Sequence, residues 1–245
     1  MPDLAFWCSS EYKGGRVLYI YYCRSGWLWK FTLLLRFSGS SHQDRRWLTM
    51  ISSGDYAPPE AQIDWLTGMM RGSAVQEATK TLRDMARLFH DADSLRRMDE
   101  NTVVYRVQWT EPVAQGTTGG LFWGSTIIEP GRVGDEYFMT HGHFHSRRDR
   151  GEYYGTIGGK GLLVLMDESR ATRTDAMFPG SLHYITGGLA HRVVNTGDEP
   201  LLFWACWPSD AGHDYASIKA DGFGARVLLR DGKPAVIHEQ KSTQL

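Results

Sequence analysis

From about residue 101 onward, the chain consists of short alternating or apolar runs that are separated by turn residues. The runs include residues 102–109, 125–128, 162–165, 191–195 and 201–207. Glycine, proline, asparagine and aspartate lie between them, and these residues favour tight turns. Many short strands with no helices between them are typical of a β-sandwich or a double-sheet barrel. We therefore predict an all-β barrel over residues 101–237.

Three histidines and a glutamate are the chemically most informative residues of this region. His143 and His145 are separated by one residue, so their side chains lie on the same face of a strand. Glu152 follows after the next bend, and His191 belongs to a later run. A single histidine is often an ordinary polar strand residue, but this combination favours a metal site. We predict that the four side chains hold one divalent ion.

The ligand types restrict the identity of the ion. Three imidazoles and one carboxylate suit Fe, Mn, Co, Ni or Zn, whereas Ca and Mg prefer sites built from oxygen. Four protein ligands leave open positions on a six-coordinate ion for water or substrate. A catalytic centre is therefore the leading interpretation.

Composition excludes several other functions. The chain has 245 residues, enough for one good core and too few for two comfortable enzyme domains. Its formal net charge of -1 gives no basic footprint for nucleic acid. The three cysteines form no Cys-x-x-Cys pair, which favours a reducing, intracellular compartment. Arg24 and Lys30 interrupt the apolar run of residues 16–37, so we predict neither a transmembrane helix nor a secretory signal.

Residues 1–49 carry no motif that links them to this chemistry. They are rich in tryptophan, tyrosine and leucine and end in a polar stretch. Two hypotheses stay open: a β-hairpin that packs on the barrel, or an N-terminal extension that the working protein lacks, with Met50 as its start. Residues 238–245 are expected to form a C-terminal tail.

Residues 50–100 are expected to be helical and to pack on the barrel without a chemical role. Apolar residues recur at spacings of three and four. These are Val75, Ala78, Leu82, Met85 and Phe89, with Lys80 among the polar residues off the stripe. Ser73 and Gln76 resemble a capping box at the start of this helix.

Two blocks of the barrel region resemble the motifs of cupins. The second motif is matched by Gly180, Gly187, Gly188, His191 and Asn195, with Thr186 where a proline is usual. The first motif would supply His143, His145 and a late Glu152. With the blocks at 134–145, 149–154 and 210–215, the chain resembles the cupin-type, metal-dependent glucose-6-phosphate isomerases of archaea and some bacteria. The resemblance implies a double-stranded β-helix, or jelly-roll, barrel.

The resemblance also implies roles for individual residues. His143, His145, Glu152 and His191 match the metal ligands, with Fe²⁺ expected first and Mn²⁺, Co²⁺, Ni²⁺ or Zn²⁺ as alternatives. A second set matches positions that hold the sugar phosphate or line its pocket: Tyr105, Thr126, Thr140, Gly142, Tyr154, His213 and Tyr215. The family is a cytoplasmic homodimer that acts in glycolysis and gluconeogenesis.

The implied reaction moves a hydrogen between C1 and C2 of a hexose phosphate. A metal that binds the oxygens of both carbons stabilises the enediolate, and Glu152 is the candidate base. A carboxylate that ligates a cation is a poorer base, because the ion lowers its pKa. Either Glu152 leaves the metal when sugar binds, or the hydrogen moves as a hydride, and the sequence leaves both routes open.

The phosphate is expected to meet a cradle of neutral hydroxyl donors and one backbone N–H. Arg147, Arg148 and Arg150 are an alternative phosphate clamp, although a run of charges is more often a solvated loop. His141 shares the strand face of His143 and His145 and is expected either behind the metal ligands or at the surface.

Three other functions fit part of this pattern. Mannose-6-phosphate isomerisation uses closely related chemistry. An iron dioxygenase also uses histidine and carboxylate ligands with open positions, but the hydroxyl-rich cradle and the block at 212–215 argue against it. A non-enzymatic cupin that binds a sugar is the third alternative.

Overall fold

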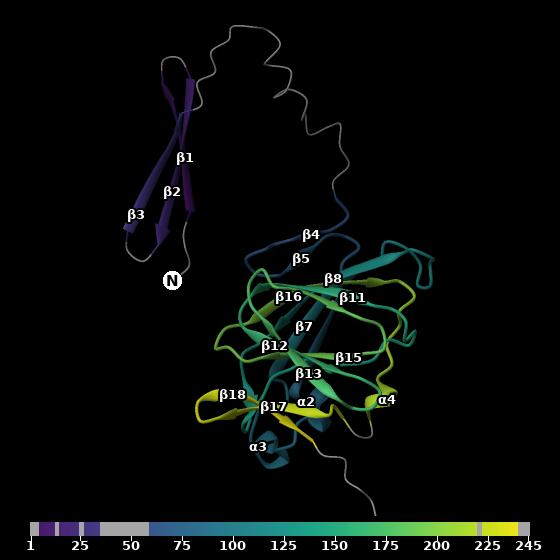
Figure 1. The fold of residues 1–245 in the computed structure, drawn as a ribbon. Coiled ribbons are helices and arrows are strands. Elements are labelled where there is room, and N and C mark those ends of the chain that lie inside the picture. The colour runs from purple at the N-terminus through teal and green to yellow at the C-terminus, as the bar shows by residue number, and fades with distance from the viewer. Residues whose placement is uncertain (1–4, 13–14, 25–26, 35–58, 220–221, 240–245) are drawn as a thin grey trace, which may run out of the picture. The chain divides into compact units, whose positions relative to one another are not determined.

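The computed structural model describes residues 5–12, 15–24, 27–34, 59–219 and 222–239 (Figure 1). The chain divides into two compact units, Met1–Pro58 and Pro59–Leu245, and each is described by itself. In the first unit, three antiparallel strands form one sheet: β1 (Ala5–Tyr12), β2 (Gly15–Arg24) and β3 (Trp27–Leu34). Residues 1–49 therefore contain strands, as the hairpin hypothesis expects, whereas Met50 lies outside the described residues.

The second unit is built around a six-stranded antiparallel sheet with the order β14-β11-β16-β8-β7-β6. Its strands are β6 (Gln76–Thr81), β7 (Val103–Thr110), β8 (Leu121–Ile128), β11 (Glu152–Gly158), β14 (Leu182–Ile185) and β16 (Leu201–Pro208). Because neighbouring strands are antiparallel, side chains in register share a face across the whole sheet.

Three smaller sheets complete this unit. One has the order β13-β12-β15, with β12 (Gly161–Met166), β13 (Thr172–Met177) and β15 (Ala190–Asn195). Another has the order β18-β17-β10-β9, with β9 (Arg132–Val133), β10 (Glu136–Tyr137), β17 (Ala225–Arg230) and β18 (Lys233–His238). The third pairs β4 (Gln62–Ile63) with β5 (Met70–Arg71). The predicted all-β class is confirmed, although hydrogen bonds between the described strands do not close the sheets into one ring.

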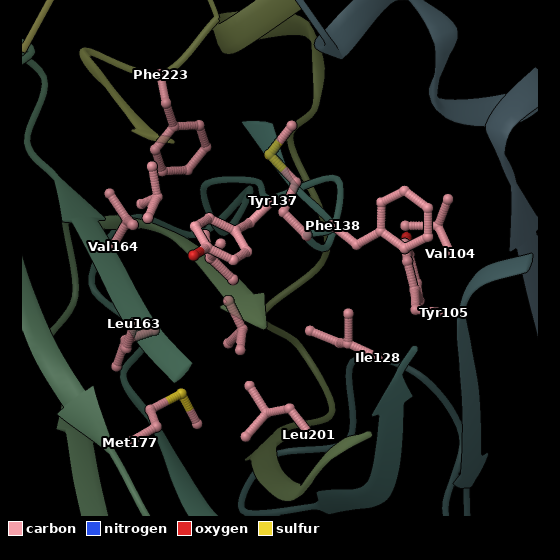
Figure 2. Packing of buried hydrophobic residues seen from close by; sticks show 14 of the residues in the cluster. Val104, Tyr105, Ile128, Tyr137, Phe138, Leu163, Val164, Met177, Leu201 and Phe223 are labelled. Atoms are coloured by element: carbon pink, nitrogen blue, oxygen red, sulfur yellow. The ribbon is translucent and has the colours of Figure 1, made fainter. Parts of the chain in front are cut away.

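The core lies between the six-stranded sheet and the β13-β12-β15 sheet. Ile128 of β8 and Leu201 of β16 are fully buried, as is Leu163 of β12. Figure 2 shows Leu163 and Met177 facing Leu201 and Ile128 across the interior. Burying a side chain of this size contributes roughly 1.5–3 kcal/mol relative to leaving it exposed. This packing holds the six-stranded sheet and the β13-β12-β15 sheet together.

The predicted helix over residues 50–100 is wrong in its first half. Residues 76–81 form strand β6, whose backbone pairs with β7 through partners such as Thr79 and Arg106. Pairing with β7 satisfies the backbone hydrogen bonds on one side of this edge strand, and such tertiary pairing overrides a helix-like spacing of apolar residues. The predicted capping box is wrong for the same reason, because Gln76 lies in the strand.

The second half of the segment is helical, in short pieces. They are α2 (Leu82–Met85), η1 (Ala86–Leu88) and α3 (Ala92–Arg96), and a further helix, α4 (Ala216–Lys219), follows much later. Leu82, Met85 and Phe89 are buried, so this part of the apolar stripe does face the core. The N–H of Thr81 donates to Oδ2 of Asp84 at 2.8 Å, which caps α2. Among the described helices, none combines the length and apolar character needed to cross a membrane.

Candidate metal centre and substrate cavity

The four predicted ligands come together from three segments of the chain. Glu152 is the first residue of β11, and His191 lies in β15 of the opposite sheet. His143 pairs with His191 as an isolated antiparallel bridge, with N–H to C=O distances of 3.3 and 3.0 Å. One ligand atom from each of these residues and from His145 lies within 4.8 Å of all the others.

The distances within this cluster fit a single ion. Nε2 of His191 lies 3.2 Å from Nε2 of His143 and 2.6 Å from Oε1 of Glu152. Nε2 of His145 lies 3.6 Å from the same Oε1 atom. Ligands bound to one ion at about 2.1 Å are about 3.0 Å apart when they are adjacent in octahedral geometry. The cluster therefore has about the dimensions of a site for one ion, with four protein ligands.

Hydrogen bonds behind the imidazoles direct their lone pairs into the cluster. Nδ1 of His145 donates to the carbonyl of Arg150 at 2.8 Å, and Nδ1 of His191 donates to the carbonyl of Leu189 at 3.3 Å. Each ring then keeps its lone pair on Nε2, which is the arrangement of histidines that ligate metals. Oε1 of Glu152 is buried and, among the described residues, has no hydrogen-bond partner. Electron pairs that face one another in this way need a cation between them.

The protonation states of the histidines and of Glu152 also suit a metal site. Burial lowers the pKa of His143 well below its usual value, and neighbouring His191 lowers it further. Burial also lowers the pKa of His145, so both rings are neutral at pH 7, the form that binds metals. Burial by itself raises the pKa of Glu152, but attraction to His191 offsets burial and leaves the pKa below its usual value. These residues fit a divalent cation.

A cavity of about 440 Å³ opens beside the cluster, on the inner face of the six-stranded sheet. His143, Glu152 and His191 line it, whereas His145 lies behind them. The seven residues predicted to contact substrate all line this cavity: Tyr105, Thr126, Thr140, Gly142, Tyr154, His213 and Tyr215. The ligand atoms and the hydroxyl groups therefore share one chamber.

The tyrosines of the cavity are hydrogen-bond donors at neutral pH. Burial raises the pKa of Tyr105 to about 12, and burial also raises the pKa values of Tyr154 and Tyr215. A phenol that stays protonated can donate to an anionic oxygen. Oγ1 of Thr140 accepts the N–H of Val193 at 3.0 Å, so its own proton is free for a ligand in the cavity.

Gly142 is required by the shape of the cavity wall. Its φ of +74° lies in the left-handed region, which favours glycine. A Cβ atom at this position would lie 2.6 Å from the ring of Phe223 and 3.0 Å from Cβ of Arg192. The backbone at this point is therefore packed as closely as the chain allows.

Residues 79–244 match the protein family described as Glucose-6-phosphate isomerase (GPI). The chain is 38% identical to glucose-6-phosphate isomerase of Pyrococcus horikoshii over 182 residues, which cover 74% of this chain and 94% of that protein. It is 38% identical to the enzyme of the same name from Sinorhizobium medicae over 177 residues, covering 71% and 81% of the two chains. The chain belongs to the glucose-6-phosphate isomerase family. Its predicted cupin type is confirmed.

Among solved structures, oxalate decarboxylase from Bacillus subtilis aligns with 44% of this isomerase-family chain and 26% of its own. The TM-score is 0.35 and the sequence identity is 22%.

Lys80 is the main cavity residue that the sequence analysis missed for this member of the glucose-6-phosphate isomerase family. The expected helix leaves Lys80 off the apolar stripe, whereas strand β6 places it opposite Tyr105 and in the cavity lining. Within the described residues, Lys80 makes no ion pair. The two-residue alternation of Ala78 and Lys80 was the available signal. His141 also lines the cavity, with its ring 4.8 Å from that of Tyr215.

The arginines of the loop between the ligands are paired with acidic residues, and none of them lines the isomerase-family cavity. Arg147 donates one hydrogen bond to Asp210 at 2.9 Å, and Arg150 donates two to the same carboxylate at 2.9 and 2.8 Å. Arg148 bonds to Asp214 at 2.6 Å. The expected solvated loop is in fact a partly exposed loop held by ion pairs, and the position of its arginines outside the cavity argues against the alternative of a phosphate clamp.

Proposed function

We propose that this chain interconverts glucose 6-phosphate and fructose 6-phosphate in the cavity beside the histidine–glutamate cluster. The observation that carries this proposal is the position of the cluster in the wall of a chamber that also contains hydroxyl donors and a lysine. A volume of about 440 Å³ is within the usual range for a small-ligand site. Membership of the isomerase family supports the same reaction.

His143, His145, Glu152 and His191 would hold the ion, and Fe²⁺ is the first expectation, ahead of Mn²⁺, Co²⁺, Ni²⁺ and Zn²⁺. When bound, a divalent ion would supply Lewis-acid chemistry to the oxygens on C1 and C2 of the open-chain sugar. The metal identity is tested by elemental analysis of protein purified without added metal. An iron content near one atom per chain supports the assignment, and a different metal at that level contradicts it.

The phosphate would lie against Lys80 and the hydroxyl groups of Tyr105, Thr126 and Thr140, with the N–H of Gly142 as a further donor. A phosphate monoester carries about −1.5 to −2 charges at pH 7. Lys80 supplies a positive charge, and the hydroxyl groups supply directed hydrogen bonds. Anchoring the phosphate in this way positions the reacting carbons relative to the ligand cluster.

Glu152 would transfer the proton. Its carboxylate takes the proton from C2 of the aldose and returns it to C1, while a proton moves from the oxygen on C2 to the oxygen on C1. The position of the buried Glu152 carboxylate in the cavity lining supports this role, because it lies beside the space that the sugar would occupy. Turnover in D₂O tests the route: deuterium in the product supports proton transfer, and complete retention of the substrate hydrogen indicates a hydride shift instead.

A coupled assay tests the whole proposal. Fructose 6-phosphate is supplied, and formation of glucose 6-phosphate is followed through a glucose-6-phosphate dehydrogenase. We expect activity that disappears on chelation and returns when Fe²⁺ or Mn²⁺ is added. Full activity after verified metal removal would contradict the metal-dependent mechanism, and inactivity of the metal-loaded protein would contradict the function.

We further propose that the chain is a cytoplasmic homodimer. The outer face of the six-stranded sheet supports the dimer, because the rings of Tyr153 and Tyr184 lie 4.9 Å apart in a tilted arrangement and are 50% and 55% exposed. Leu182 is exposed nearby on β14. Exposed apolar patches on a sheet are typical of protein–protein contacts. Sedimentation of the wild type and of Tyr153→Glu tests this, because a variant that stays dimeric would place the contact elsewhere.

A further inference from the structure

A second cavity, of about 630 Å³, lies next to the first, and its lining contains a group of basic residues. It lies among the short helices α2, η1 and α4 and the strands β15 and β17. Five cationic side chains line it: Arg83, Arg87, Arg192, Lys219 and Arg226. Asp84 is the one carboxylate among its described lining residues, and that group already accepts the N–H of Thr81.

Only part of this positive charge is neutralised. Arg83 pairs with Glu100, and Arg226 pairs with Glu136 at 2.9 Å. Arg87, Arg192 and Lys219 have no ion pair with any residue in the described part of the chain. Three cations without an ion pair among the described residues therefore border one cavity.

Arg192 is the most informative of the three. It is 4% exposed, and its guanidinium donates from Nη2 and Nε to the carbonyl of His141 at 2.8 and 3.3 Å. The group also lies over the ring of Phe223, 4.2 Å from the centroid. A buried cation without a direct ion pair is costly, even when some of its donors are satisfied and the carboxylate of Glu136 attracts it from farther away. A bound anion in the cavity would supply the missing charge.

We propose that the second cavity binds a small anion with two phosphate groups. Each phosphate monoester carries about −1.5 to −2 charges, so two such groups match three cations better than one does. Arg192 at the base provides a planar donor group for one phosphate. Arg87 of η1 and Lys219 of α4 are exposed members of the lining, and their long side chains can contact the ligand from two different elements.

This second site would act on the first through a shared wall. His141 and Tyr215 line both cavities. Gly142, in the first cavity, approaches Phe223 and Arg192 of the second. Negative charge bound behind this wall would weaken binding of the substrate phosphate, so KM for fructose 6-phosphate would rise to a plateau while kcat stays unchanged. This effect on turnover rests on the proposed function, whereas binding of the anion does not.

Calorimetric titration of the metal-loaded full chain with 2,3-bisphosphoglycerate tests the site directly. We expect saturable binding that is weakened at least about tenfold in Arg87→Ala/Lys219→Ala, since each lost charge-assisted contact reduces affinity by about that factor or more. The matched control is Lys160→Ala/Lys233→Ala, which removes two exposed lysines outside both cavities. No binding, or equal binding by both double variants, would overturn the proposal.

A second comparison separates the two cavities. If the probe bound only in the catalytic chamber, Lys80→Ala would weaken its binding and Arg87→Ala/Lys219→Ala would not. Inhibition would then be purely competitive, with KM rising in proportion to probe concentration and reaching no plateau. That pattern overturns the proposal. The opposite pattern, with KM reaching a plateau, supports it. Unfolding temperatures of all variants confirm that each remains folded, and a chain that binds the probe but shows no turnover would refute only the proposed function.

Discussion

Lys80 provides the sharpest test of how the catalytic cavity recognises its substrate. It lies opposite Tyr105 in the β6–β7 pair and lines the cavity without an ion-pair partner among the described residues. Replacement by alanine removes the positive charge and leaves the strand hydrogen bonds intact. We therefore expect Lys80→Ala to weaken the interaction with the phosphate while the protein remains folded.

The size of the effect follows from the kind of contact. A hydrogen bond to a charged group contributes about 1.5–3 kcal/mol, and the half-buried position of Lys80 favours the lower part of that range. A loss of about 2 kcal/mol corresponds to a decrease of about 30-fold in kcat/KM. Because the contact lies away from the reacting carbons, most of this decrease should appear in KM.

The assay compares fructose 6-phosphate with unphosphorylated fructose, each at concentrations well below KM. Lys80→Ala should reduce turnover of the phosphorylated sugar and leave the slow reaction of fructose unchanged. Thr79→Ala is the matched control, because Thr79 is the preceding strand residue and is exposed on the other face. An equal loss with both sugars, or no loss with either, would refute the assignment of Lys80 to the phosphate.

Three further predictions concern the metal cluster and its surroundings. His145→Ala and His191→Ala should each lose bound metal and nearly all turnover while circular dichroism shows the native β-sheet, and retained metal would contradict the ligand assignment. Because burial lowers the folded-state pKa values of His143 and His145, their contribution to stability is present above about pH 6.5 and is lost as the pH falls through the lowered values. Urea unfolding of the metal-free protein from pH 8 to pH 5 should show this loss, and constant stability would argue against neutral buried rings. Gly142→Ala should reduce the free energy of unfolding by at least about 2 kcal/mol, through left-handed backbone strain and contact with Phe223. An unchanged melting curve would contradict this, because it would mean that Phe223 and the backbone move to accommodate the methyl group.

The metal cluster could be predicted because its signal is local. The one-residue spacing of His143 and His145 puts both on one face of an extended segment. Glu152 and His191 complete the donor set by their residue types, and the family resemblance implies the same four ligands. The seven substrate positions also came from the family resemblance, and the structure brings all of them together in the lining of one cavity. These features depend on short-range geometry and on motifs of fixed spacing.

Strand β6 and the role of Lys80 could not be predicted in this way. Residues 75–89 contain an apolar spacing that suits a helix, and the helical half from Leu82 onward is real. What makes residues 76–81 a strand is the edge of β7, which lies beyond a helical segment in the sequence. The second cavity has the same character, because Arg87, Arg192 and Lys219 meet only through the tertiary fold. Pairing between distant segments is not encoded in any short window of sequence.

The backbone bridge between His143 and His191 has a consequence for the supply of the ion. Two main-chain hydrogen bonds fix these residues to each other whatever occupies the space between their rings. Metal-free protein would therefore keep these two ligands beside each other, and one ion could be exchanged for another without refolding. Since such donor sets accept several first-row metals, the concentrations of those metals inside the host, rather than the polypeptide, would decide which one is loaded.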